Sequence, residues 1–357
     1  MATYKSIKYI IPVEAVEHTD SINALNDVDT VSTAPADGQI LKWNNTNSKW
    51  YPGDVEEAGS SGTQKAIFGF GRFAGNNSGL TSITNLVSSS GVVATDTTGI
   101  GTARDSVSAA SYGGDKALFG FGSNDSSVTN LVSNNGVVAS DTTGVGTGRS
   151  ELAAAGFGGD KAIFGFGGIS SSATSITNLV SNTGVVASDT TGVGGSRIGL
   201  AAAGFGGDKA IFGFGLEAGY NLANTFNLVS NAGVVATDTT GVGTDRMNLA
   251  AAGFGGDKAI FGFGLPGYNT TNITNLVSNT GVVASDTTGV GTGRNTLAAS
   301  GYGGDKAIFG FGNLQGQESA YSKITNLVSN LGVVATDTTG VGTARYGLAA
   351  AGYSTTA

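Results

Sequence analysis

The sequence predicts an all-β fold, and three observations in its 357 residues support this class. One stretch recurs six times, most clearly as R-S-E-L-A-A-A-G-F-G-G-D-K-A-I-F-G-F-G at residues 149–167. Its glycine-rich pattern carries no apolar period of 3.6 residues, which argues against helix. Copies follow one another at intervals of 45 to 51 residues, a period typical of supersecondary units that bury their apolar faces by stacking on one another.

Each repeat keeps most of its internal spacing fixed. The step from the repeated arginine to the next repeated lysine is always 12 residues, and the step from the asparagine of N-L-V-S to the following arginine is always 19. Only the segment between the F-G-F-G run and that asparagine changes length. The repeated residues are Lys65, Lys116, Lys161, Lys209, Lys258 and Lys306; Arg104, Arg149, Arg197, Arg246, Arg294 and Arg345; and Asn85, Asn130, Asn178, Asn227, Asn275 and Asn326.

We expect four short antiparallel strands in each repeat. In the third copy they fall at residues 152–157, 162–167, 176–181 and 184–189, the last two joined by an N-T-G turn. Four antiparallel strands per repeat are typical of a propeller blade. The alanines of the first strand suit a crowded axis, and the phenylalanines of the second strand are expected to face glycines of the neighbouring sheet.

The two ends of the array complement each other. The first copy enters at Lys65 without a preceding R-x-x-L-A-A-A-G, whereas the last copy ends on that sequence at residues 345–353. Pairing the C-terminal strand with the first copy completes six blades and removes the exposed edges of an open array. We therefore expect residues 61–357 to form a closed six-bladed β-propeller of four-stranded blades.

The motif R-x-x-L-A-A-A-G-[FY]-G-G-D-K-A-I-F-G-F-G resembles the kelch repeat in its small-residue strand, double glycine and aromatic strand. The resemblance covers residues 65–353. It implies a propeller whose first blade is closed by the C-terminal strand. It also implies that the connections between second and third strands lie on a face that kelch domains commonly use for binding.

Residues 1–60 differ in composition and hold both tryptophans and most of the net charge of −8. We expect a strand or extended arm at 5–13, a short helix at 19–29, a hairpin at 37–54 and a linker at 56–62. The strings D-G-Q-I-L-K-W and K-W-Y-P-G-D resemble a module of tail-fibre and other virion structural proteins of tailed bacteriophages. This resemblance implies a virion-attachment segment with Trp43 and Trp50 as anchors; the alternative is a plain hairpin that packs a tryptophan pair.

Composition excludes several classes of function. The chain has no cysteine, hence no disulfide and no thiolate metal site, and it has no basic patch for nucleic acid or anionic membrane. No apolar run is long enough for membrane insertion. A copper oxidase site needs cysteine and histidine ligands, but His18, the sole histidine, precedes the repeats. A sialidase site needs an exceptional cluster, whereas the arginines have the same partners in every copy. We predict no enzyme, no cofactor and no metal.

The repeated arginines and the aspartates of G-G-D-K and D-T-T-G admit two interpretations. They could form rings that bind an anion or calcium, or they could be structural, the aspartates in turns and the arginines on carbonyl groups or neighbouring aspartates. We favour the structural interpretation. An ion site remains open at this point.

The length-variable loops are the candidate binding surface, because binding surfaces are commonly built by loop variation on a fixed scaffold. The alternative is neutral drift at tolerant loop tips. Their aromatic and amide residues are typical of sites that stack on sugars or anchor a protein: Phe73, Asn76, Tyr220, Asn221, Tyr268, Asn269 and Tyr321.

The resemblance of the N-terminal segment to phage virion modules implies a phage virion protein, made in the host cytoplasm. The first hypothesis is a tail-fibre or tail-tip adhesin that binds a host glycan or protein. The second is a capsid decoration or head fibre with a structural role. Either would contact other virion proteins through residues 1–60, and a homo-oligomer is compatible with both.

Overall fold

The chain divides into two compact units, Met1–Ala58 and Gly59–Ala357, which are treated separately below. The computed structural model describes Val28 and residues 39–44, 48–54, 63–73, 79–170, 172–314 and 320–356. These residues are all-β, and none of them lies in an α-helix. Consequently no helix in this part of the chain is long and apolar enough to cross a membrane.

In the first unit, the predicted hairpin is confirmed. Strand β1 (Gln39–Asn44) pairs antiparallel with β2 (Lys49–Asp54), and the register places Trp43 opposite Trp50. Val28, the one described residue of the expected helix, instead forms a parallel bridge with Trp50. The expected arm at 5–13 and the linker at 56–62 lie outside the described residues.

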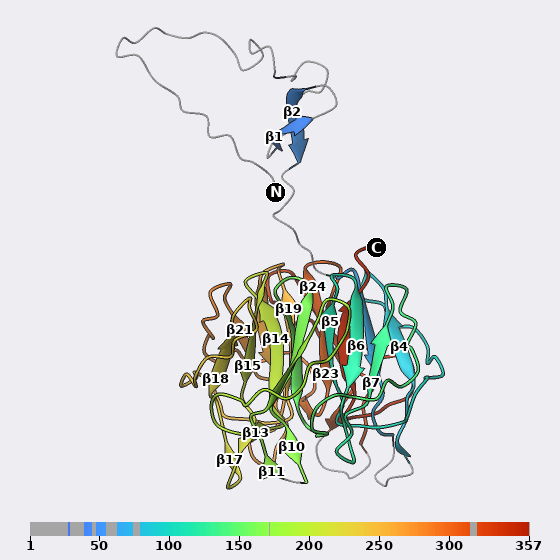
Figure 1. Ribbon diagram of the computed structural model, residues 1–357, viewed down its shortest axis with the longest axis vertical. Coiled ribbons are helices and arrows are strands. Elements are labelled where there is room, and N and C mark those ends of the chain that lie inside the picture. Colours follow the sequence, from blue (N-terminus) through green and yellow to red (C-terminus); the bar gives the residue numbers. More distant parts are fainter. Residues whose placement is uncertain are drawn as a thin grey trace. The chain divides into compact units, whose positions relative to one another are not determined.

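The second unit contains six equivalent three-stranded antiparallel sheets (Figure 1). Each consists of an alanine strand (A-A-A-G-F type), a central phenylalanine strand (K-A-I-F-G type) and an asparagine strand (T-N-L-V type). In that order, sheet 1 is β27 (Ala349–Tyr353), β3 (Lys65–Gly69) and β4 (Thr84–Val87); sheet 2 is β5 (Ser108–Tyr112), β6 (Lys116–Gly120) and β7 (Thr129–Val132); sheet 3 is β8 (Ala153–Phe157), β9 (Lys161–Gly165) and β12 (Thr177–Val180); sheet 4 is β14 (Ala201–Phe205), β15 (Lys209–Gly213) and β18 (Phe226–Val229); sheet 5 is β19 (Ala250–Phe254), β20 (Lys258–Gly262) and β21 (Thr274–Val277); sheet 6 is β23 (Ala298–Tyr302), β24 (Lys306–Gly310) and β26 (Thr325–Val328).

The prediction of a fourth strand in each sheet was wrong. The G-V-V-A-S-D segment of sheet 3 makes only two isolated bridges to the asparagine strand, Val180 to Val186 and Thr177 to Thr190. From one bridge to the other, the outer segment runs from Val186 to Thr190, whereas β12 runs from Thr177 to Val180. The outer segment therefore has one extra residue, as in a β-bulge. The Asn178 side chain fills the gap by donating to the carbonyl of Ala187 at 3.0 Å, so side-chain bonding replaces a regular ladder.

Neighbouring sheets interlock large residues against small ones, as the sequence predicted. A Cβ atom added to Gly69 of β3 would lie 2.7 Å from the Phe119 ring of sheet 2, so only glycine fits there. The same contact recurs between successive sheets, and Gly310 of sheet 6 meets the Phe68 ring of sheet 1 at 2.8 Å. Phenylalanine pairs such as Phe70 and Phe119 add edge-to-face contacts, with ring centroids 5.1 Å apart.

The predicted pairing of the C-terminal strand with the first copy is confirmed. Strand β27 pairs with β3 in a register that places Ala349 opposite Gly69 and Tyr353 opposite Lys65. The alanine strands lie beside one another in the order β5, β8, β14, β19, β23 and β27, and β27 also lies beside β5.

Short ribbons extend the sheets at one end, where β10, β11, β13 and β17 appear together in Figure 1. They form where the residues that follow each arginine meet the length-variable loops. Their bounds are β10 (Gly168–Ile169), β11 (Ser172–Ala173), β13 (Arg197–Ile198), β16 (Leu216–Glu217), β17 (Asn221–Leu222), β22 (Arg294–Asn295) and β25 (Asn313–Leu314). We call this the loop end, and the opposite end, with the G-G-D-K turns, the turn end.

Deleting residues 345–357 should destabilise the whole second unit. The deletion removes the alanine strand of sheet 1, the buried side chains of Leu348 and Tyr353, and the buried Arg345. At roughly 1.5–3 kcal/mol for each large apolar side chain, the loss should be about 5 kcal/mol or more, comparable with the stability of a typical domain. Thermal unfolding of this variant can be compared with a control that lacks only residues 355–357; equal melting temperatures would contradict the proposed role of β27.

Candidate binding face at the loop end

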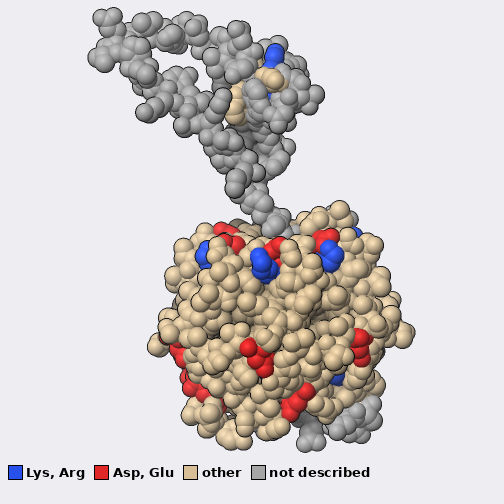
Figure 2. All heavy atoms as spheres, in the orientation of Figure 1, with Lys and Arg blue, Asp and Glu red and all other residues tan. Residues whose placement is uncertain are grey.

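The turn end is a ring of structural contacts. The first glycine of each turn donates its N–H to a carbonyl of the next turn, as from Gly113 to Asp160 and from Gly158 to Asp208, both at 2.7 Å. Each described aspartate of these turns pairs with the lysine that follows it, at 2.6 to 3.2 Å. Figure 2 shows basic and acidic side chains side by side along one rim of this unit.

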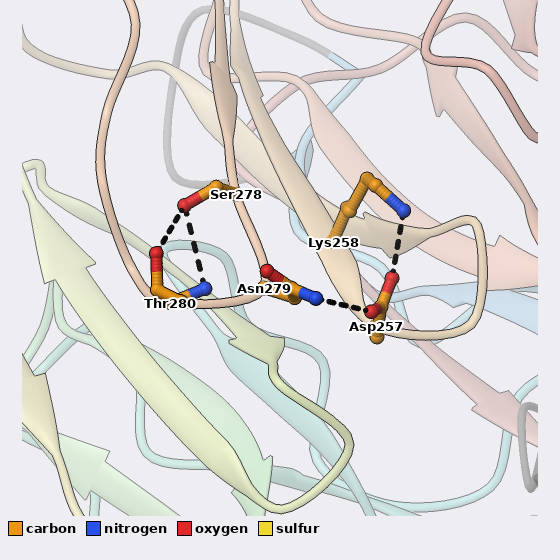
Figure 3. Close-up of polar contacts among 5 residues, drawn as sticks. All are labelled: Asp257, Lys258, Ser278, Asn279 and Thr280. Carbon is orange, nitrogen blue, oxygen red and sulfur yellow. Dashed lines mark hydrogen bonds and ion pairs between the residues drawn. The ribbon is translucent and has the colours of Figure 1, made fainter.

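Figure 3 shows this arrangement in sheet 5. Asp257 accepts from Lys258 at 2.8 Å and from Asn279 at 3.0 Å, while the hydroxyls of Ser278 and Thr280 lie 2.9 Å apart beside them. A cavity of about 220 Å³ opens between the turns, lined largely by glycine and by lysines such as Lys161 and Lys209. Because each of these lysines is paired with an aspartate, the cavity has no net positive charge with which to hold an anion.

The six repeated arginines are buried clamps between sheets. Arg149 donates from Nε to the carbonyl of Phe166 at 2.7 Å, from Nη1 to the carbonyl of Thr147 at 3.0 Å and from Nη2 to Oδ1 of Asn178 at 2.7 Å. Its guanidinium carbon also lies 4.4 Å from the centre of the Phe121 ring in the preceding sheet. Arg345 repeats these contacts between sheets 1 and 6, with Phe70, Asn85 and the Phe311 ring.

The D-T-T-G aspartates complete this network. Asp189 accepts from Asn178 at 2.9 Å, and from both the N–H and the hydroxyl of Thr147, the hydroxyl at 2.6 Å. Burial lowers the pKa of Arg149 to about 10, while Asp189 opposes that shift, so the guanidinium stays charged at neutral pH. The arginines and these aspartates are therefore linked through the asparagine and threonine that both contact, which supports the structural interpretation over an ion ring.

Arg197 is the exception among the six. Gly195 stands where the other copies have threonine, so from this position Asp238 accepts the Gly195 N–H, at 2.8 Å, and no threonine hydroxyl. Arg197 Nε is buried without a hydrogen-bond partner, although Nη1 donates to the carbonyl of Thr225 at 2.6 Å and Nη2 to Asn227. This sheet therefore has a weaker clamp than the others.

Replacing a clamp arginine by methionine should destabilise the second unit most where the clamp is complete. Arg149→Met leaves Asn178 and the backbone carbonyls of Phe166 and Thr147 without their donor, and breaking a buried network of this kind typically costs about 3–5 kcal/mol. Arg197→Met should cost clearly less, because its Nε bond is already absent. Chemical denaturation of both variants measures the difference; equal losses would refute the ranking.

Stability should fall on acidification below about pH 4. Burial raises the pKa of Asp141, but hydrogen bonds from Thr102 and Asn130 outweigh it, and the pKa ends below its usual 3.8. The same shift applies to Asp96, Asp189, Asp286 and Asp337. A carboxyl whose pKa is lower in the folded than in the unfolded state stabilises the fold above the unfolded value, and this contribution is lost as the pH drops through the folded value.

Melting temperatures measured between pH 2.5 and 7 at constant ionic strength test this dependence. An Asp141→Asn, Asp189→Asn variant should show a shallower decline than the unmodified protein. Identical profiles would indicate that other groups govern acid unfolding.

The loop end holds the candidate binding residues on separate sheets. Phe73, Tyr220 and Tyr268 are 43%, 89% and 98% exposed, on sheets 1, 4 and 5. Asn221 and Asn269 are exposed beside the two tyrosines. Asn76 lies outside the described residues.

Tyr321 differs from these exposed loop residues. It is half-buried and stacks on Tyr346, with ring centroids 4.9 Å apart and an interplanar angle of 24°. Tyr346 directly follows Arg345, and burial raises its pKa. Next to it, Arg72 Nε lies 2.8 Å from Oδ2 of the buried Asp105. The predicted residue Tyr321 thus lies in a group with Tyr346, Arg72 and Asp105, which the sequence did not single out.

A second missed set consists of the residues two positions after each arginine. They are Ser106, Glu151, Gly199, Asn248, Thr296 and Gly347, which we call the collar. A chain of backbone hydrogen bonds of 2.7 to 2.9 Å links them, from Ser106 N–H to Gly347 and onward through Thr296, Asn248 and Gly199 to the carbonyl of Glu151. The signal was present in the sequence, because the pair of residues that follows each repeated arginine is different in all six copies, whereas the alanine strand that comes next changes little.

No protein-family model matches the chain, and no curated protein matches it significantly. Within the described residues, no group of three or more histidine, cysteine, aspartate or glutamate side chains is placed to hold a metal ion.

Proposed function

We propose that the second unit is a closed, kelch-like six-bladed β-propeller, carried by a non-enzymatic virion protein of a tailed bacteriophage that recognises the host surface through its loop end. Closure is supported by the pairing of β27 with β3 and by Thr343, whose hydroxyl donates to Asp96 at 2.6 Å across 247 residues of chain. The fit of Gly310 against Phe68 supports it further, because sheets 6 and 1 then pack like any other successive pair.

One observation carries the proposed recognition role. Length variation collects at the loop end, and most sequence variation does too, on a scaffold that is otherwise nearly the same in all six sheets. The second unit is entered from the other end, since the Thr63 carbonyl accepts from Gly304 among the turns. A chain attached to a particle through residues 1–60 would therefore have the loop end of its propeller far from the point of entry, free to meet a host glycan or protein.

A capsid decoration or head-fibre role is the second candidate, and a different surface favours it. Each sheet exposes the first valine of its G-V-V segment, with exposed fractions between 63% and 66%. These are Val92, Val137, Val185, Val234, Val282 and Val333. Such a repeated apolar belt could pack against other virion proteins or a second copy of the chain.

The triple variant Phe73→Ala, Tyr220→Ala, Tyr268→Ala should lose adsorption to host cells while its melting temperature stays unchanged. The rings are exposed, so their removal opens no cavity, whereas losing an aromatic anchor at a binding hot spot typically costs about 2 kcal/mol, or about thirtyfold in affinity. Adsorption of the purified chain to host cells, measured with a fluorescent label, gives the comparison.

The matched control replaces Val185, Val234 and Val282 of the belt by serine. Adsorption should survive in this variant if the loop end is the binding face. Retained adsorption in the aromatic variant, together with lost incorporation of the valine variant into particles, would overturn the adhesin proposal in favour of decoration.

A further inference from the structure

The collar residues share an unusual backbone conformation. All six have positive φ, from 47° at Thr296 to 64° at Gly347. This left-handed region suits glycine and costs L-residues roughly 1–2 kcal/mol, with a β-branched threonine the least suited of all. Two of the six positions are glycine. The backbone turn therefore forms without a side chain, and four copies carry one at an energetic cost.

The collar surrounds a cavity of about 90 Å³ at the loop end, lined by residues from all six sheets. Its deeper wall is aliphatic, with one buried side chain from each sheet: Val107, Leu152, Leu200, Leu249, Leu297 and Leu348. The space equals the volume share of about three water molecules. It has room for a small polar substituent such as a hydroxymethyl group.

The polar groups of the collar are available to a ligand. Within the described residues, the side chains of Ser106, Glu151 and Asn248 make no hydrogen bond, and the Thr296 hydroxyl donates to Asn295 at 2.8 Å. Asn248 lies toward Gly199, where an added Cβ atom would come 2.7 Å from its Oδ1. The fold therefore leaves an amide, a carboxyl and a hydroxyl facing one small cavity without using them.

The chemistry of this set favours an uncharged, hydroxyl-rich ligand. Glu151 is the one charged side chain of the collar, and the nearby Arg72 is already held by Asp105, so no cation is free there to bind an anionic group. Hydroxyl, amide and carboxyl groups donate to and accept from sugar hydroxyls, and the aliphatic wall suits C–H surface. Tyr346, next to Gly347, presents a half-buried ring beside the collar.

We propose that the collar binds the terminal unit of a neutral glycan, with a hydroxymethyl or acetamido arm in the cavity and the sugar ring over the collar near Tyr346. This inference rests on the proposed recognition role and narrows it to one site and one ligand class. The four side chains are kept at strained positions because they contact the sugar.

The decisive variant replaces Ser106, Glu151, Asn248 and Thr296 by glycine in the full chain. Since glycine already occupies this position in two copies and relieves strain in the others, the melting temperature should stay the same or rise. Binding should weaken at least thirtyfold, because the variant lacks every side-chain hydrogen bond of the collar. Binding is measured on an array of neutral and sialylated glycans, and then by titration with the neutral glycan bound best.

Asn279→Ala, at the turn end, is the matched control and should bind like the unmodified chain. If the fourfold variant fails to fold, the single variants Asn248→Gly and Glu151→Gln replace it, and each should weaken binding at an unchanged melting temperature. Undiminished binding by the folded collar variants, or binding of sialylated glycans alone, overturns the inference. A blank array with intact adsorption to host cells also overturns it, yet leaves the proposed recognition role standing with a protein receptor.

Discussion

The buried arginine is the interaction on which the second unit depends. In every copy but that of Arg197, the guanidinium donates hydrogen bonds to the carbonyl that follows the phenylalanine strand and to the asparagine strand of its own sheet. It also stacks on a phenylalanine of the preceding sheet. A buried cation is tolerated only where its donors are used, and here the backbone carbonyls and the asparagine side-chain oxygen that accept from them lie on chain segments that would otherwise be loosely tied. The G-V-V-A-[ST]-D segment outside each asparagine strand is one such segment. The asparagine that accepts from the arginine also donates to a carbonyl of that segment.

This dependence explains why charge is sparse and repetitive in the unit. The charges that exist are paired in the same way in nearly every sheet, as arginine with aspartate through asparagine, or as lysine with the preceding aspartate. Variation is then left to positions where no pairing is required. Most of those positions lie at the loop end, in the length-variable loops and in the collar.

Much of this arrangement could be predicted from the sequence. The period, the glycine-against-phenylalanine packing and the offset ends predicted the strands, their partners and the pairing of β27 with β3. The fourth strand was wrong because alternation in G-V-V-A-S-D cannot reveal a bulge or the competition of an asparagine side chain for backbone carbonyls. The collar was missed because positive φ at Glu151 or Thr296 contradicts local preference. Sequence also could not show that Tyr321 stacks on Tyr346, since that contact joins two different sheets.

The offset between sequence repeat and sheet has a consequence for biosynthesis. Strand β3 is the first strand of the second unit and β27 is its last, so one edge of β3 stays unpaired until β27 has been made. Sheets 2 to 6 can assemble in order as the chain leaves the ribosome, but the interfaces of sheet 1 with sheets 2 and 6 are completed only once β27 has emerged. A prematurely terminated chain would carry an open edge that recruits other strands or proteases. The position of one strand thus makes the completion of sheet 1 depend on synthesis of all the strands between β3 and β27.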